Sequence, residues 1–234
     1  MLPWLGRDPR APFPPPETAL REPNGLLAVG GDLNPQRLLT AYRLGIFPWY
    51  SEGEPILWWT PDPRWVLTPA TLHLGRSLRK SLRHTTVQVS LNQDFSAVVR
   101  ACAAPRSQQQ GTWLNSAMQA AYLRLHLLGY AHAVEIWQAS ELVGGLYGVA
   151  LGGVFFGESM FSRQPDASKF ALIALVRFMQ AQGMSLLDCQ VESAHLRYLG
   201  ASPLPRMQFQ QQLTQLCPLP LRPHTWPAQI LPLT

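Results

Sequence analysis

The sequence predicts an α+β protein in two parts: a small aromatic-rich N-terminal domain over residues 1–62, and a larger domain over residues 63–234 with a central, mostly antiparallel sheet. Strand-like runs at 131–137, 142–150 and 154–161 are joined by short turns, which is typical of an antiparallel meander. Helical periodicity flanks these runs. An aromatic cluster at 46–59 precedes a Pro61-Asp62-Pro63 linker, which favours a division there.

The elements follow from local signals. Asn34 before Pro35 predicts a helix start, and Gly45 ends that helix. Asn92 or Asp94 caps a later helix that ends near residue 103. The other expected elements beyond the linker are a strand at 64–67, a helix at 73–84, a strand at 85–91, helices at 115–128 and 166–182, a strand at 185–191 and helices at 193–199 and 208–216.

The chain has few charged residues, and its net charge is positive. Charged residues make up 14% of the 234 residues, and 19 basic against 14 acidic residues give a net charge of +5 with a pI near 9.4. On a chain with few charges this balance favours a polyanionic partner such as nucleic acid. The alternative is charge that serves only solubility.

Cysteine use and hydropathy predict a cytoplasmic protein with no membrane association. Cys102, Cys189 and Cys217 are far apart and form no C-x-x-C pair, which argues against structural zinc and fits a reducing compartment. Residues 1–10 lack the apolar core of a signal peptide. The longest uncharged stretch, residues 142–157, is too short for a membrane span.

Common catalytic motifs are absent from the sequence. There is no phosphate-binding G-x-x-x-x-G-K-[ST] loop, no G-x-G-x-x-G opening a helix after a strand, no His-Glu-x-x-His and no nucleophile elbow. Cys189 and His195 could form a thiol–imidazole pair, but a cysteine in an apolar strand is more often an inert core residue.

A group of basic residues stands out at positions 76–83. Arg76, Arg79, Lys80 and Arg83 recur at helical spacing and predict one basic helix face, suited to a phosphate backbone or simply solvated.

Glu158 and Asp188 lie in apolar runs, so each must have a partner or a function, because an unpaired buried carboxylate costs several kcal/mol. In a regular strand Asp188 and Gln190 face the same side and Cys189 the other, which indicates either a polar site in a cleft or a structural hydrogen-bonded pair.

Eight motifs give the chain a specific resemblance to a known family. They are residues 22–33 (EPNGLLAVGGDL), 45–50 (GIFPWY), 58–64 (WWTPDPR), 111–113 (GTW), 132–135 (HAVE), 144–150 (GGLYGVA), 157–162 (GESMFS) and 188–190 (DCQ). Together they resemble leucyl/phenylalanyl-tRNA–protein transferase over nearly the whole chain. Leu114 and Thr60 depart mildly from the pattern, and the proline-rich tail after Cys217 lies outside it.

The resemblance implies a cytoplasmic aminoacyltransferase. We expect it to be a monomer without cofactor, and no metal is needed because an aminoacyl ester is already activated. Such an enzyme moves Leu or Phe, and Met less well, from aminoacyl-tRNA to proteins that begin with Arg or Lys, and the product carries an N-terminal degradation signal. The larger domain is then expected to have an acetyltransferase-like (GNAT) fold. That fold's acetyl-CoA loop is missing between Phe161 and Lys169, which fits a donor other than acetyl-CoA.

The resemblance also implies roles for single residues. Glu158, Asp188 and Gln190 would serve the acceptor amine and the chemistry. Trp49 and Trp113 would flank the 3′ adenosine, and the pocket for the transferred side chain would be lined by Leu146, Phe155, Leu172 and Leu187. The alternatives are an acyl-CoA-dependent acyltransferase of the same fold and a non-catalytic RNA-binding module.

Overall fold

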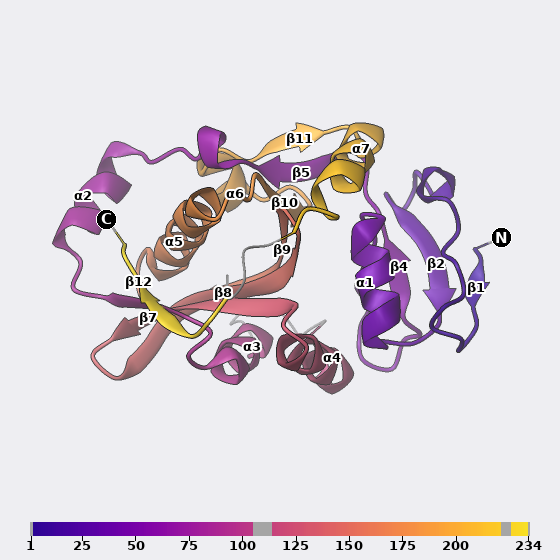
Figure 1. The fold of residues 1–234 in the computed structure, drawn as a ribbon, viewed down its shortest axis with the longest axis horizontal. Helices are drawn as coiled ribbons and strands as arrows, with labels where there is room; N and C mark the ends of the chain where they lie inside the picture. Colours follow the sequence, from indigo (N-terminus) through magenta and orange to yellow (C-terminus); the bar gives the residue numbers. More distant parts are fainter. Residues whose placement is uncertain (1, 105–113, 221–225, 234) are drawn as a thin grey trace.

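The structure is a computed structural model that describes residues 2–104, 114–220 and 226–233. Its N-terminal part is a four-stranded sheet, at the right of Figure 1, with helix α1 (Pro35–Arg43) packed beside it. The strand order is β1 (Trp4–Leu5), β2 (Leu26–Gly30), β4 (Leu57–Trp59) and β3 (Phe47–Pro48). The short 3₁₀ helix η1 (Pro16–Thr18) lies between β1 and β2 in the sequence.

Helix α1 begins and ends as its sequence predicts. Asn34 Oδ1 accepts a hydrogen bond from Gln36 N at 3.0 Å, and Gly45 follows the helix with φ at 72°. Leu38, Ala41 and Tyr42 are buried on the inner side of the helix.

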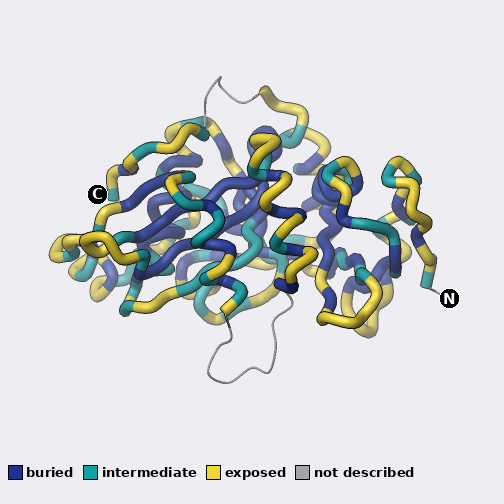
Figure 2. Tube along the Cα trace, turned by 90° about the horizontal axis from the view of Figure 1, so that it is seen from below, coloured by how far each residue is buried: buried dark blue, intermediate teal, exposed yellow. Residues whose placement is uncertain are grey.

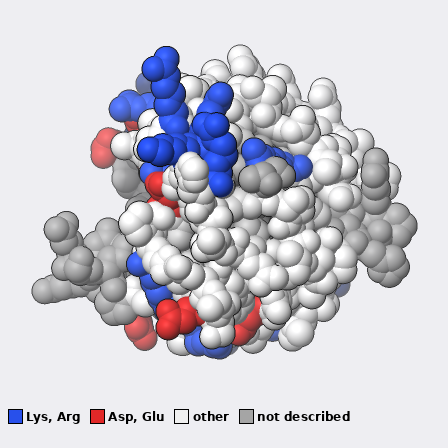
Figure 3. All heavy atoms as spheres, turned by 90° about the vertical axis from the view of Figure 1, so that its left-hand side faces the viewer, with Lys and Arg blue, Asp and Glu red and all other residues white. Residues whose placement is uncertain are grey.

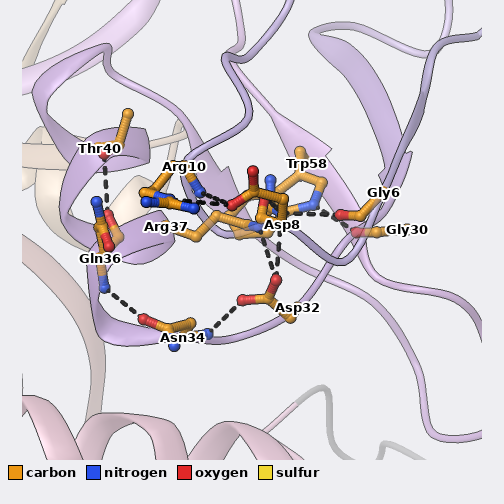
Figure 4. Close-up of polar contacts among 10 residues, drawn as sticks. All are labelled: Gly6, Asp8, Arg10, Gly30, Asp32, Asn34, Gln36, Arg37, Thr40 and Trp58. Atoms are coloured by element: carbon orange, nitrogen blue, oxygen red, sulfur yellow. Dashed lines mark hydrogen bonds and ion pairs between the residues drawn. The ribbon is translucent and has the colours of Figure 1, made fainter.

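A buried arginine ties the start of the chain to α1 (Figure 4). Arg37 donates from Nη2 to the carbonyl oxygens of Gly6 and Asp8 at 2.8 and 2.5 Å, and from Nε to Asp32 Oδ2 at 3.2 Å. Asp32 Oδ1 accepts from the backbone N–H of Asn34, which carries the network to the helix cap. The N-terminal segment and α1 are therefore held in one arrangement.

The larger part is built on an eight-stranded sheet. Its strand order is β11 (Ser202–Leu204), β5 (Arg64–Leu67), β10 (Leu186–Gln190), β9 (Val154–Ser162), β8 (Glu141–Leu151), β7 (Ala131–Gln138), β6 (Gln88–Leu91) and β12 (Gln229–Leu231). Every neighbouring pair is antiparallel except β10 and β9. The predicted meander β7–β8–β9 and the predicted α+β class with a mostly antiparallel sheet are confirmed.

Helices cover both faces of this sheet (Figure 1). Helix α5 (Ala167–Ala181) packs on β7 and β8 from one side, and α3 (Phe95–Ala103) and α4 (Ser116–Leu127) pack from the other. One apolar core lies under α5, and a second runs from α3 and α4 into the N-terminal part through Tyr42 and Trp58. In Figure 2 the buried segments accordingly run through the middle of the molecule.

The remaining elements lie around the sheet. They are the 3₁₀ helix η2 (Pro69–Thr71), α2 (Arg76–His84), α6 (Ala194–Tyr198) and α7 (Arg206–Leu216). No helix in the described ranges combines the length and apolar character that crossing a bilayer needs.

The parallel contact between β9 and β10 is short. Their register runs only from Val154 opposite Leu186 to Phe156 opposite Asp188. Beyond it β9 continues beside β8 to Ser162, whereas β10 has an irregularity between Asp188 and Gln190 in its pairing with β5. The two strands therefore separate just past Phe156 and Asp188.

Some expectations differ from the structure. Helix α7 begins at Arg206 instead of residue 208, because Pro205 sets the N-terminal boundary. The tail supplies β12, which sequence patterns did not predict. The domain division at residue 62 stays a prediction, and Arg206 crosses it by donating to Thr60 O at 2.7 Å.

Candidate active site

A cavity of about 300 Å³ opens where β9 and β10 separate. Its apolar wall includes all four side chains expected to form the amino-acid pocket: Leu146, Phe155, Leu172 and Leu187. These come from β8, β9, α5 and β10, so the fold brings together residues up to 41 positions apart in the sequence. Polar residues line the same cavity as well, Glu158, Asp188, Gln190 and His195 among them.

Glu158 is the centre of a group of polar contacts. Its Oε1 accepts from the Tyr42 hydroxyl at 2.8 Å and from Gln190 Nε2 at 2.9 Å, and its Oε2 accepts from the Tyr122 hydroxyl in a short hydrogen bond. The two tyrosine hydroxyls also lie 3.0 Å apart. Tyr42 comes from α1 and Tyr122 from α4, so three distant elements meet at this carboxyl group.

The three oxygen contacts among Glu158, Tyr42 and Tyr122 need three hydrogens, and the two phenols supply two. A third hydrogen, on Glu158, completes the ring of contacts: Glu158 then donates to one tyrosine, that tyrosine donates to the other, and the other donates back to Glu158. Burial raises the pKa of Glu158 to about 7, against the hydrogen bonds from Tyr122 and Tyr42, which lower it. Burial and the nearby Glu158 charge raise the pKa of both tyrosines well above 10, so both stay protonated.

Asp188 is fully buried in an ion pair that the sequence analysis did not identify. Arg64 donates from Nε to Asp188 Oδ1 at 2.8 Å and from Nη2 to Oδ2 at 2.7 Å. Arg64 Nη1 donates to Gly45 O at 3.0 Å, and the guanidinium lies over the rings of Phe47 and Phe209 at 4.8 and 4.9 Å. The expectation that each buried carboxylate has a partner holds for Asp188 and Glu158 alike.

Gln190 does not follow the regular strand geometry that the sequence analysis assumed. Its backbone lies in the left-handed region at φ 62°, and its N–H donates to Asp188 Oδ1 at 2.8 Å. This irregularity brings the side-chain amide to Glu158, and the two side chains form no hydrogen bond with each other among the described contacts. Asp188 and Gln190 nevertheless both line the cavity, as the cleft alternative predicts. Asp188 holds the backbone of Gln190 in place.

Cys189 has no features of a nucleophile. Burial and the Asp188 charge raise the pKa of its thiol far above the ordinary value, so the thiol stays protonated. This agrees with the interpretation of Cys189 as an inert core residue.

A second cavity of about 170 Å³ adjoins the first. It is lined by Phe47, Pro48, Trp49, Glu158, Gln190 and Val191, and so shares Glu158, Gln190 and Val191 with the first cavity. Trp49 is 48% exposed, and its backbone carbonyl oxygen accepts from Trp59 Nε1 at 2.7 Å. Trp113, the other expected stacking residue, lies outside the described residues.

Helix α2 carries the predicted basic face. Leu78 and Leu82 are buried beneath it, and the four expected phosphate contacts are exposed: Arg76, Arg79, Lys80 and Arg83. Figure 3 shows Lys and Arg side chains gathered on the face of the molecule to which α2 belongs. Helix α6 connects the start of α2 with the main cavity. Gly75, which precedes α2, contacts Tyr198 of α6, and His195 and Leu196 of α6 line the cavity.

Comparison with known proteins decides the family. The model of a family described as leucyl/phenylalanyl-tRNA protein transferase matches residues 66–214, and that of the family's N-terminal domain matches residues 31–62. This chain belongs to that family. Proteins named leucyl/phenylalanyl-tRNA–protein transferase are similar in Stutzerimonas stutzeri, with 57% identity over 91% of this chain and 94% of that protein, and in Nitrosospira multiformis, with 54% identity over 97% of each. The expected enzyme class, an aminoacyltransferase, is thereby confirmed.

Among solved structures, the transferase is similar to a GCN5-related N-acetyltransferase from Kribbella flavida, with a TM-score of 0.37 and 15% identity over 72% of this chain and 60% of the other. It is also similar to L-PGS from Bacillus licheniformis, with a TM-score of 0.39 and 11% identity over 72% and 54% of the two chains.

Three residues of the site were missed by sequence reasoning: Tyr42, Tyr122 and Arg64. Tyr42 and Tyr122 each lie on the apolar stripe of a helix, where a tyrosine is ordinarily a core residue. Arg64 follows the linker directly and gives no periodic signal. The one available clue was the requirement that Asp188 have a partner.

Proposed function

We propose that this transferase moves Leu or Phe, and Met less well, from aminoacyl-tRNA to the N-terminal Arg or Lys of acceptor proteins. The new peptide bond would give the acceptor an N-terminal degradation signal. We further infer that it acts in the cytoplasm as a monomer. The observation that carries the proposal is that an apolar cavity and a tryptophan-walled cavity meet at Glu158 and Gln190.

The apolar cavity suits the side chain of the donor. Its wall of leucine and phenylalanine offers only dispersion and desolvation to a ligand, which favours Leu, Phe and Met over polar residues. Pockets of this kind discriminate by about 1–3 kcal/mol for each methylene, so partial use of Met is expected.

The second cavity suits the 3′ adenosine that carries the ester. The exposed ring of Trp49 is a surface for base stacking, worth about 1–3 kcal/mol for each base. An adenosine stacked there, with its aminoacyl side chain in the apolar cavity, would place the ester near the shared residues Glu158 and Gln190.

The reaction needs alignment more than strong catalysis, because the ester is already activated. The amine nitrogen attacks the ester carbonyl, the bond to the tRNA 3′ oxygen breaks, and that oxygen takes up a proton as the amide forms. An α-amine has a pKa near 7.7–8.0, so its neutral form costs only about 1–1.4 kcal/mol at pH 7. Positioning can contribute about 7–11 kcal/mol in favourable cases.

The side chain of Gln190 is the group that would orient the amine. Asp188 is a positioning residue, because Arg64 occupies its carboxylate and its remaining hydrogen bond fixes the backbone of Gln190. Asp188→Asn should therefore lower turnover while leaving the affinity for Phe-tRNA unchanged. An unchanged single-turnover rate in the variant would exclude this role.

Glu158 is the acidic group suited to an acceptor that begins with Arg or Lys. In its charged form it offers a charge-assisted hydrogen bond to the cationic start of the chain. Glu158→Gln should raise KM for an Arg-started peptide while the binding of Phe-tRNA stays the same. An unchanged KM would contradict the assignment.

The deciding experiment mixes the transferase, labelled Phe-tRNA and a peptide that starts with Arg. Amide-linked label on the peptide supports the proposal, and a peptide of the same sequence that starts with Ala is the matched control. Dependence on acyl-CoA would favour the acyltransferase alternative. Binding of deacylated tRNA without any transfer would favour the RNA-binding module.

A further inference from the structure

The chain returns to the large sheet after α7. Residues 226–233, the tail segment, include β12, which pairs antiparallel with β6 and places Ile230 opposite Ser90 (Figure 1). The match to the transferase family ends at residue 214, so the tail segment lies beyond the matched residues.

The tail segment is fixed at both ends. The Trp226 ring stacks on His132 with a centroid distance of 4.2 Å and an interplanar angle of 8°, and Trp226 O accepts from Asn92 Nδ2 at 2.9 Å. At the other end, Arg177 Nη1 donates to Leu233 O. Burial lowers the pKa of His132 to about 3, so the stacked imidazole is neutral at physiological pH.

Trp226 also contacts a wall of the amino-acid pocket from behind. Its ring centroid is 5.6 Å from that of Phe155 and 4.9 Å from that of Phe178. Phe155 lines the apolar cavity, and Trp226 is not among the residues that line it. The Phe155 ring of β9 lies against Gly148 of β8, where a Cβ atom would clash with the ring. Gly148 is opposite His132 of β7, and Trp226 stacks on His132.

We propose that the tail segment, through Trp226, fixes this wall of the pocket and thereby sets the preference between Leu and Phe donors. This inference rests on the proposed function. Trp226 is a positioning residue, because it acts through Phe155. Its ring packs against that of Phe155 without lining the cavity itself. Removing it leaves a cavity behind Phe155, and a pocket that can deepen favours the longer side chain of Phe over Leu.

The test compares kcat/KM for Phe-tRNA and Leu-tRNA with one Arg-started peptide. Trp226→Ala should raise the Phe-to-Leu ratio about tenfold, the lower end of the range expected for a change of one methylene in an apolar pocket. Trp226→Phe should keep the ratio within about twofold of the wild type, because an aromatic ring remains and the buried Trp226 Nε1 has no hydrogen-bond partner among the described residues. Ile230→Ala, at a 54% exposed position of the same segment, is the matched control.

A loss of activity in which the two donors fall equally would overturn the proposal, because it would assign Trp226 to stability alone. If Trp226→Ala does not fold, Trp226→Leu tests the same point, with a smaller rise in the ratio expected and an unchanged ratio contradicting it. Failure of the wild type to transfer either residue would instead refute the proposed function.

Discussion

At the scale of single residues, one proton on Glu158 decides how four side chains are joined. Protonated Glu158 completes the hydrogen bonds with Tyr42 and Tyr122 and still accepts from Gln190. When the carboxylate is charged, the two phenols both donate to it, and no hydrogen remains for the contact between them. Binding of a cationic acceptor would favour the charged form.

The raised pKa of Glu158 has a consequence for stability. The folded protein binds this proton more tightly than the unfolded chain, so the stabilisation is fully present below pH 4.5 and is lost as the pH rises to about 7. We therefore expect Glu158→Gln to gain stability relative to the wild type between pH 5 and pH 8, measured by urea unfolding at each pH. Glu52→Gln, at an exposed position, should show no such gain in the free energy of unfolding with rising pH. If the free energies of unfolding of wild type and Glu158→Gln change with pH in parallel, Glu158 does not hold the extra proton.

The Arg64–Asp188 pair gives a prediction of stability. Arg64→Ala leaves the Asp188 carboxylate buried without a counter-charge and should lower the free energy of unfolding by about 3–5 kcal/mol in denaturant titrations. Arg197→Ala removes one partner of the exposed pair with Glu192 and should cost less than about 1 kcal/mol. Similar losses of free energy of unfolding in the two variants would show that the buried pair stabilises the fold no more than the exposed pair.

At the scale of elements, substitutions of Gln190 at the end of β10 should affect stability and turnover differently. Gln190 has a φ of 62°, which costs an ordinary residue about 1–2 kcal/mol and costs glycine little. Gln190→Gly should keep the free energy of unfolding within about 1 kcal/mol of the wild type, while turnover falls because the amide is gone. Gln190→Val should lower both. Full activity in Gln190→Gly would exclude the orienting role of the amide.

The same strand shows where prediction from the sequence stops. The pattern predicted β7, β8 and β9, because local alternation and short turns determine a meander. It also predicted α1, since Asn34 and Pro35 are local signals. It failed at Gln190, because an irregular residue leaves no mark in the alternation. The partners of Glu158 and Asp188 could not be predicted, because Arg64 lies 124 residues from Asp188 and the helix containing Tyr42 reaches Glu158 only through the packed core.

At the scale of the whole molecule, the basic face of α2 should govern the response to salt. Each phosphate contact contributes about 0.7–0.9 to the slope of log K against log salt concentration. Neutralising the four basic residues of the α2 face to glutamine should make the slope for tRNA binding shallower by up to about 3.6, and the buried Leu78 and Leu82 should keep the helix folded. Glutamine at Arg7 and Arg21, exposed in the N-terminal part, is the control, and equal slopes in all proteins would exclude α2 from the tRNA contact.

The short register between β9 and β10 has a final consequence. Past Phe156, the pairing of β9 with β10 ends among the described residues, and residues 157–159 of β9 line the cavity. Amide and carbonyl groups are the same whatever residue carries them. Replacing the lining side chains would thus alter the side-chain surface of the cavity, while the main-chain groups of residues 157–159 would persist through such changes.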